Sequence, residues 1–161
     1  MIHREILISV IGGHDCNEEV EEIAHEIGSI IAKVGAILVC GGLGGVMEAA
    51  CKGAKDQGGR AIGILPGTEK NDANPFVDIA IPTSMGFARN TIVACCADLI
   101  VALPGSHGTN SEICYGLVYK RPVIDLGGWN IPGMIPAKDL AQAKALIEEH
   151  VGKLRMARKS T

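Results

Sequence analysis

Aromatic side chains are scarce in this sequence. Its 161 residues include two Tyr, two Phe and one Trp, too few for the rows of rings on which single-stranded nucleic acids stack. An excess of basic residues is also lacking, because 15 Lys and Arg are outnumbered by 18 Asp and Glu, giving a formal charge of −3. We therefore expect no nucleic-acid partner. The one basic cluster is typical of a solvated helix end and comprises Lys153, Arg155, Arg158 and Lys159.

Long apolar runs are missing as well. No run approaches the roughly 20 residues that cross a bilayer, and the first apolar segment, from Ile6 to Ile11, is shorter than the core of a signal peptide and ends in Gly12-Gly13. The six cysteines show neither CxxC pairing nor zinc-ligand spacing. We expect a soluble, cytoplasmic protein without a metal site, in which the cysteines are reduced and mostly buried.

The sequence does contain a regular alternation of strand-length apolar runs and helical patterns. Its length of 161 residues and hydrophobic content of 47% suit one domain with a full core. The alternation predicts the α/β class, as a single domain over residues 1–161 with a mostly parallel β-sheet flanked by helices on both faces. The predicted strands are 6–11, 37–40, 61–65, 77–81, 99–103 and 122–126. The predicted helices start after Asn17, after Gly45, after Thr83 or Ser84, near Thr109 and at Asp139.

Glycine doublets follow three of the predicted strands, at positions 12–13, 41–42 and 127–128. Glycine at such a point permits a positive φ and lets a ligand approach the backbone closely. Each doublet alone is equally typical of a tight turn with no ligand. Three of them at one edge of a sheet favour a binding site.

The segment from Pro104 to Glu112 carries the strongest functional signal. Glycines, hydroxyls and one carboxylate lie where an apolar strand gives way to a helix starting near Thr109. The N-terminus of such a helix offers unpaired N–H groups and the positive end of its dipole to an anion, so we expect a phosphate there. Thr109 and Glu112 also fit a capping box, in which the carboxylate bonds back to the cap. The local sequence favours the capping box over a free carboxylate.

Three other places carry polar groups of interest. The segment Gly41-Gly42-Leu43-Gly44-Gly45 resembles a phosphate-cradling turn but matches neither GxGxxG nor the Walker A pattern. His107 could donate to a phosphate, although a lone loop histidine is more often only solvated. Arg89 lies early in a predicted helix, where the dipole disfavours a cation, so we expect it to have an anionic partner, in the site or in a surface ion pair. Asn90 could bond a ribose hydroxyl or the local backbone.

Three ordered motifs carry a family resemblance. Pro104-Gly105-Ser106-His107-Gly108-Thr109-Asn110-Ser111-Glu112 resembles the PGGxGTxxE motif of the LOG-like (SLOG) superfamily, which includes cytokinin-activating phosphoribohydrolases and proteins long labelled lysine decarboxylases. The stretch from Gly41 to Met47 is similar to that family's GGxxGxM motif. Met85-Gly86-Phe87-Ala88-Arg89-Asn90 is similar to its arginine-bearing segment. Order and spacing agree across about residues 6–126.

The resemblance implies a Rossmann-like fold, usually a homodimer, that binds nucleoside monophosphates and in some members hydrolyses the bond between base and ribose 5-phosphate. It assigns Arg89 and Glu112 as the catalytic pair and implies no required cofactor beyond the phosphorylated, nucleotide-like ligand. A carboxylate suits this reaction, because departure of the base leaves an oxocarbenium-like sugar. The residues expected to bind the ligand are Gly12, Gly13, Gly41, Gly42, Gly44, Gly45, Met47, Asn90, Pro104, Gly105, Ser106, His107, Gly108 and Thr109.

The sequence departs from the family pattern at two points. Ser106 replaces the second glycine of PGGxGTxxE, and a positive φ there would cost about 1 kcal/mol or more unless the turn differs. The segment 86–90 differs from an MHxRK-like form and looks more like a bacterial and archaeal branch, some of whose relatives resemble carriers of the molybdenum cofactor. Two functions therefore stay open. We place a nucleoside 5′-monophosphate phosphoribohydrolase slightly ahead of a non-catalytic nucleotide or molybdopterin carrier.

Overall fold

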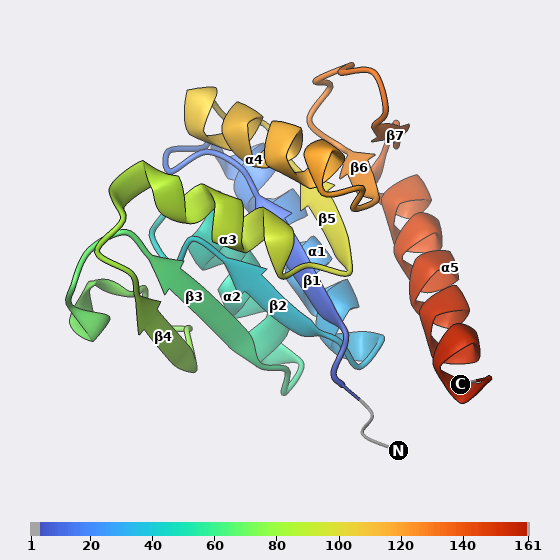
Figure 1. The fold of residues 1–161 in the computed structure, drawn as a ribbon, viewed down its shortest axis with the longest axis horizontal. Coiled ribbons are helices and arrows are strands. Elements are labelled where there is room, and N and C mark those ends of the chain that lie inside the picture. Colours follow the sequence, from blue (N-terminus) through green and yellow to red (C-terminus); the bar gives the residue numbers. More distant parts are fainter. Residues whose placement is uncertain (1–3, 161) are drawn as a thin grey trace.

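A seven-stranded, wholly parallel sheet forms the centre of the computed structural model, which describes residues 4–160 (Figure 1). The ends of the predicted domain, residues 1–3 and 161, lie outside the described residues. The strand order is β4-β3-β2-β1-β5-β6-β7. The strands are β1 (Leu7–Ile11), β2 (Ile37–Cys40), β3 (Ala61–Leu65), β4 (Ile79–Pro82), β5 (Leu99–Ala102), β6 (Val123–Asp125) and β7 (Ile135–Pro136).

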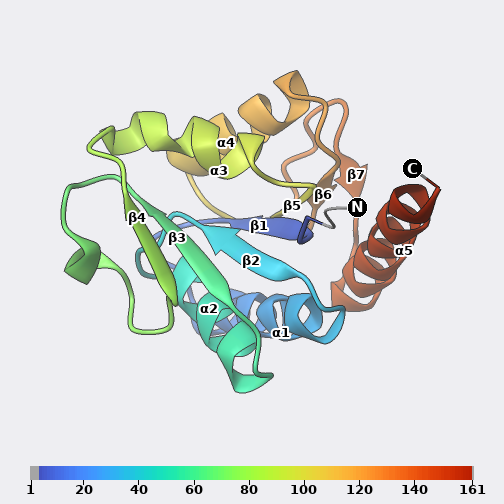
Figure 2. The same cartoon turned by 60° about the horizontal axis from the view of Figure 1, so that its bottom comes forward.

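Helices cover both faces of the sheet, as predicted (Figure 2). One face carries α1 (Glu18–Lys33) and α2 (Val46–Asp56), and α5 (Leu140–Lys159) packs into the same apolar layer. The other face carries α3 (Asn90–Cys95) and α4 (His107–Val118). Two apolar layers therefore bury the sheet between them, which is why the central strands read as continuous apolar runs.

Local signals place two of the long helices. The Asn17 side chain accepts a hydrogen bond from the Val20 N–H at 2.9 Å, and the Asp139 side chain accepts one from the Gln142 N–H at 2.9 Å. Each carboxamide or carboxylate satisfies an N–H group that the helix leaves unpaired. These caps confirm the predicted starts of α1 and α5.

The segment before α3 differs from the prediction. Neither Thr83 nor Ser84 caps a helix, because Ser84 adopts a left-handed φ of 59° and the chain first makes a short 3₁₀ turn, η2 (Gly86–Arg89), before α3 begins. The Thr83 hydroxyl instead accepts a hydrogen bond from the Met85 N–H at 3.3 Å. Among the strands, β1, β5 and β6 are one or two residues shorter than predicted, β4 begins two residues after the predicted Val77, and β7 was not predicted.

Helices α1 and α2 pack closely through two glycines. A Cβ built on Gly28 would lie 1.9 Å from the Ala50 carbonyl oxygen, and one built on Gly53 would lie 1.8 Å from the His25 carbonyl oxygen. Both distances are far below van der Waals contact, so only glycine allows the two backbones to approach this closely. This packing fixes α2, and with it the loop that precedes α2.

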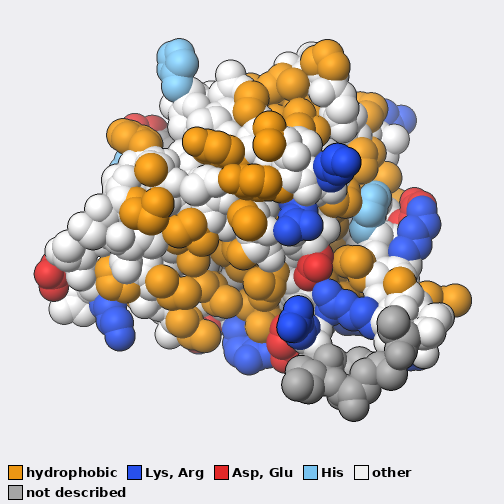
Figure 3. Space-filling view, viewed as in Figure 1, with side chains coloured by type: hydrophobic (Ala, Val, Ile, Leu, Met, Phe, Trp, Pro, Cys, Tyr) orange, Lys and Arg blue, Asp and Glu red, His pale blue; other side chains and the backbone are white. Residues whose placement is uncertain are grey.

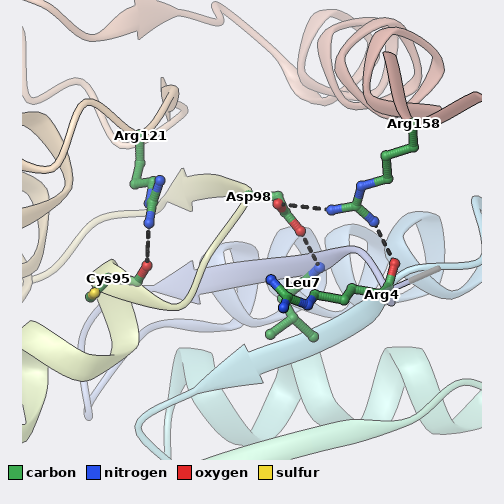
Figure 4. Close-up of polar contacts among 6 residues, drawn as sticks. All are labelled: Arg4, Leu7, Cys95, Asp98, Arg121 and Arg158. Atoms are coloured by element: carbon green, nitrogen blue, oxygen red, sulfur yellow. Dashed lines mark hydrogen bonds and ion pairs between the residues drawn. The ribbon is translucent and has the colours of Figure 1, made fainter. Parts of the chain in front are cut away.

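The C-terminal helix is hydrogen-bonded to residues at the amino ends of the central strands (Figure 4). Asp98 accepts hydrogen bonds from the Leu7 N–H at 2.9 Å and from Arg158 at 3.1 Å. Arg158 also donates to the Arg4 carbonyl at 2.5 Å. One carboxylate therefore joins β1, the start of β5 and α5. These contacts lie at the amino ends of the strands, away from their carboxyl ends.

The cysteines are all free, but the prediction that most are buried is wrong. Only Cys40 and Cys51 are buried, with their sulfur atoms 3.4 Å apart, whereas Cys95 and Cys114 are exposed. Cys95 and Cys114 lie on the outer surfaces of α3 and α4. The periodicity of the sequence alone did not distinguish these surfaces from the surfaces that face the sheet. No helix among residues 4–160 has the length and apolar character needed to span a membrane.

Candidate functional site

A cleft of about 340 Å³ lies at the carboxyl edge of the sheet. Strands β1 and β5 are neighbours, yet the chain leaves β1 toward α1 on one face and leaves β5 toward α4 on the other. The segments that follow the two strands therefore lead to opposite faces of the sheet, and parallel sheets bind ligands in the crevice at such a topological switch point. Nine residues predicted from the sequence line the cleft: Gly12, Gly13, Met47, Arg89, Asn90, Ser106, Gly108, Thr109 and Glu112.

The N-terminus of α4 forms one wall of this cleft. The helix begins at His107, with Ser106 as its cap, and among the described residues the N–H groups of His107, Gly108 and Thr109 have no acceptor. Ser106 has a φ of −125°, so the serine in place of the motif glycine is not strained. The three N–H groups and the helix dipole suit an anion.

The predicted capping box does not form. Because α4 starts two residues before Thr109, Thr109 is the third residue of the helix and Glu112 lies in its second turn. No side chain caps this helix, and the Thr109 hydroxyl makes no hydrogen bond within residues 4–160. The Glu112 carboxyl group therefore does not bond back to the start of the helix, contrary to the capping box that the local sequence predicts.

Close packing holds the turn before α4 in place. A Cβ on Gly105 would lie 2.2 Å from the Thr109 hydroxyl oxygen and 2.9 Å from the Gly13 nitrogen. The Gly13 N–H donates to the Pro104 carbonyl at 2.9 Å. The loops after β1 and β5 are thus joined directly, and Gly105 leaves the Thr109 hydroxyl uncovered.

Arg89 is buried, with 6% of its surface exposed. It donates to the Ile64 carbonyl at 2.8 Å, to the Gly41 carbonyl at 3.4 Å and to the Asn90 side chain. No carboxylate lies within 4.0 Å of it among the described residues, so the surface ion pair is excluded. Burial lowers the pKa of the guanidinium, while the charge of Glu112 opposes that shift.

Glu112 faces the same cleft from α4. Only 7% of its surface is exposed, and its carboxyl group makes no hydrogen bond within residues 4–160. Burial raises its pKa to about 8, and Arg89 opposes the rise. The carboxyl group therefore holds a proton at neutral pH, in a site that also contains a buried cation.

Asn90 connects the two halves of the site. Its side-chain nitrogen donates to the Gly108 carbonyl at 3.3 Å and to the Ser111 hydroxyl at 3.1 Å, and its oxygen accepts from Arg89. Of the two alternatives for Asn90, the structure shows contacts within the protein. These contacts fix the guanidinium of Arg89 relative to the first turn of α4.

Of the glycine segment 41–45, only Leu43 lines the cleft. A Cβ on Gly41 would lie 2.7 Å from the Arg89 Nη2 atom, so this glycine leaves space for the guanidinium. Gly42 and Gly45 adopt left-handed φ values of 79° and 63°. The Asn74 N–H donates to the Gly42 carbonyl at 2.9 Å. Gly41 therefore shapes the site through Arg89, whereas a Cβ on Gly42 would meet Leu65 and Gly63.

Other predicted residues lie outside the cleft. His107 is exposed and Gly44 lies beside His14, whereas Gly45, Pro104 and Gly105 line neighbouring hollows. The third glycine doublet, 127–128, belongs to a turn organised by Asp125, whose carboxylate accepts from the N–H groups of Gly127, Trp129 and Asn130. That doublet is accounted for by the turn alone.

Three cleft residues were not predicted from the sequence: His14, Leu43 and Phe87. Each occurs within or beside a segment that sequence reasoning singled out, following Gly13, inside the glycine segment and two residues before Arg89. Their position next to residues already predicted to bind the ligand was the signal in the sequence that could have identified them. Phe87 is 83% exposed although it is a large apolar residue.

The cleft is suited to a small phosphorylated ligand. Unpaired amides and a buried guanidinium supply positive charge for a phosphate, and a protonated carboxyl supplies a hydrogen-bond donor. A larger cavity of about 480 Å³ between α1 and α2 is lined mainly by glutamates, which repel phosphate. Among residues 4–160, no group of three or more His, Cys, Asp or Glu side chains is arranged to hold a metal ion.

Comparison with known proteins gives consistent results. The model of the SLOG cluster4 family matches residues 5–155. A protein of Archaeoglobus fulgidus with an uncharacterized function is 46% identical over 119 residues, which cover 74% of this chain and 78% of that protein.

Two solved structures resemble the whole fold. The molybdenum cofactor binding protein of Rippkaea orientalis is 33% identical with a TM-score of 0.85, over 91% of this chain and 97% of that one. The molybdenum cofactor carrier protein of Chlamydomonas reinhardtii is 35% identical with a TM-score of 0.84, over 92% and 99% of the two chains.

Proposed function

The chain belongs to the SLOG cluster4 family, and from that premise we propose that it binds the molybdenum cofactor as a carrier and leaves the ligand intact. The likeness to two molybdenum-cofactor-binding proteins over more than nine-tenths of the chain supports this proposal. It reverses the order suggested by the sequence, in which the hydrolase came first.

The observation that carries the proposal is the cleft itself. The cofactor is a pterin that bears a phosphate, and the cleft combines a phosphate-binding helix end with a buried Arg89 and apolar walls from Leu43 and Met47. Its volume of about 340 Å³ is in the range of small-ligand sites. The α4 amides, the Thr109 hydroxyl and Arg89 would hold the phosphate, and Glu112 would face the remainder of the ligand.

The raised pKa of Glu112 argues against one hydrolytic role, that of an ionised carboxylate beside the sugar. Hydrolysis of a nucleoside monophosphate places positive charge on the sugar, which an ionised carboxylate stabilises. Glu112 has a pKa of about 8 and is protonated at pH 7. A neutral carboxylic acid lacks that charge and instead donates a hydrogen bond, as a heterocycle with carbonyl and ring-nitrogen acceptors requires.

A loading experiment tests the proposal. Cofactor released from a molybdoenzyme is incubated with the protein, and free ligand is removed by anaerobic gel filtration. We expect molybdenum and pterin to elute with the protein in equal amounts. Thr109→Val, which removes only the hydroxyl at the cleft, should retain less cofactor. Thr68→Val is the matched control, because the exposed Thr68 hydroxyl donates to the Glu69 side chain at 3.1 Å and does not line the cleft. Elution of the protein without molybdenum would reject the carrier function.

One observation favours hydrolysis as a second candidate. Arg89 and Glu112, which the family resemblance pairs as catalytic residues, both line the cleft. Incubation with nucleoside 5′-monophosphates, followed by chromatography, tests it. Release of free base and ribose 5-phosphate by the wild type but not by Glu112→Gln would establish the hydrolase.

We also propose that copies of this chain associate through the surface of α3 and α4. Apolar side chains gather there (Figure 3), and Tyr115, Val118 and Tyr119 are 39%, 72% and 36% exposed. The two tyrosine rings stack on one another, with centroids 6.1 Å apart. Exposed apolar area of this kind marks contact sites. Val118→Glu should lower the mass measured by light scattering, and an unchanged mass would count against this interface.

The cytoplasm is the compartment that we propose. Six free cysteines, of which Cys95 and Cys114 are exposed, suit a reducing environment.

A further inference from the structure

Phe87 is the aromatic residue that lines the cleft. All five Phe, Tyr and Trp residues are described, and the other four do not line this cleft, so Phe87 offers its one benzenoid ring to a planar ligand, beside the imidazole of His14. It is 83% exposed, the largest exposed fraction among the large apolar residues of the described chain. Burying a phenylalanine side chain stabilises a protein by about 1.5–3 kcal/mol, and here the fold alone does not gain that energy.

The backbone holds Phe87 at this place. The Ser84 N–H donates to the Gly67 carbonyl at 2.9 Å, and the Gly86 N–H donates to the Pro66 carbonyl at 2.9 Å. Gly86 has a φ of +57°, which turns the chain immediately before the ring. The backbone leading to Phe87 is thus fixed before any ligand arrives, which lowers the entropic cost of binding.

The surroundings of the ring leave room for a flat group. A Cβ built on Gly108 would lie 3.9 Å from the Phe87 Cε1 atom, so the ring approaches the first turn of α4 at a residue without a side chain. Two residues after Phe87 the same turn ends at the buried Arg89. A single short segment therefore presents a ring at the mouth of the cleft and a guanidinium inside it.

We propose that Phe87 is a stacking platform that selects a planar heterocycle for the cleft, while the amides of α4 hold the phosphate of the same ligand. Aromatic side chains stack on flat heterocycles with little dependence on their edge groups. The ring therefore selects for a heterocycle as such, and the polar groups inside the cleft select among heterocycles. This inference rests on the proposed function, because it names the part of the ligand that Phe87 recognises.

Three probes separate the contributions: neopterin monophosphate has a pterin ring and a phosphate, GMP has a purine ring and a phosphate, and ribose 5-phosphate has no ring. Titration calorimetry measures the affinity of each for the wild type, Phe87→Ala and Phe87→Trp. We expect Phe87→Ala to weaken binding of neopterin monophosphate at least about fivefold, to leave ribose 5-phosphate unchanged, and Phe87→Trp to retain the wild-type affinity. Met85→Ala is the matched control, because Met85 is also exposed on this segment, at 44%, but does not line the cleft.

The outcomes distinguish this inference from the proposed function. If Phe87→Ala binds both ring-bearing probes as the wild type does, or loses ribose 5-phosphate equally, the stacking role is wrong. If Phe87→Ala instead lowers the mass in solution, the ring belongs to a contact between copies, which also overturns the inference. Phe87-dependent binding of GMP without binding of neopterin monophosphate would support stacking and count against a pterin as the ligand. Binding of neither ring-bearing probe would reject the stacking role, while the loading experiment decides the carrier function.

Discussion

Glu112 makes the stability of this protein depend on pH in an unusual direction. Its pKa rises from 4.5 to about 8 on folding, so between these values the folded state holds a proton that the unfolded chain has lost. The free energy of unfolding then falls by about 1.4 kcal/mol for each pH unit in this window. Stability from this group is complete below pH 4.5 and is lost as the pH rises to about 8, by about 5 kcal/mol in all.

The test is Glu112→Gln, which keeps the shape of the side chain and removes the proton equilibrium. By pH 7 the wild type has lost about 3 kcal/mol through Glu112, since 7 lies about 2.5 units above the pKa of the unfolded chain. The free energy of unfolding of the variant, relative to that of the wild type, should therefore increase as the pH rises. Urea unfolding followed by circular dichroism at pH 5, 7 and 8.5 measures the difference.

Two titratable groups near Glu112 keep their protonation state across this pH window. Arg89 remains charged throughout, and the Cys40 thiol, which also feels the charge of Glu112, has a pKa raised well above its usual value by the Cys51 thiol and by burial. Glu22→Gln removes an exposed carboxylate and is the control, with a curve parallel to the wild type. If the Glu112→Gln curve is also parallel to the wild type from pH 5 to 8.5, the carboxyl group is ionised throughout, and the case for a neutral donor fails.

Three glycines give further predictions. Gly41→Ala should weaken binding of ribose 5-phosphate in calorimetry at least about tenfold, because its Cβ would lie 2.7 Å from the Arg89 Nη2 atom and displace the guanidinium; unchanged affinity would show that Arg89 does not contact the phosphate. Gly28→Ala should lower the free energy of unfolding by about 3 kcal/mol or more, or prevent folding, since its Cβ would lie 1.9 Å from the Ala50 carbonyl oxygen. Gly152→Ala, in α5 with nothing within 4 Å, should raise it by about 0.5–1 kcal/mol in urea unfolding; a loss would mean that α5 packs differently.

Most of the fold could be predicted because its signals are local. The strands β2 and β3 match the predicted ranges 37–40 and 61–65, since short apolar runs between glycines have few alternatives. Asn17 and Asp139 identify helix starts through bonds to residues three positions later. Such contacts join residues that are close together in the sequence, so the residue types alone indicate them.

The candidate site was less predictable where contacts join distant residues. The capping box failed because the turn from Pro104 to Ser106 starts α4 earlier than Thr109, and backbone packing against Gly13 decides that turn. Arg89 was expected to have an anionic partner, but carbonyls 25 and 48 residues away bind it. Nothing in the local pattern of residues 84–96 indicates which side chain points inward.

The junction of Asp98, Arg158 and Arg4 has a practical consequence. Because Arg158 donates to the Arg4 carbonyl (Figure 4), these two points of the chain are adjacent. They lie at the amino ends of the strands, whereas the cleft lies at the carboxyl ends. A short peptide could join residues 4 and 158 to give a circular permutant, with new ends opened in an exposed loop elsewhere. By the same geometry, a protein tethered near either position to a sensor surface would present its binding cleft to the solution.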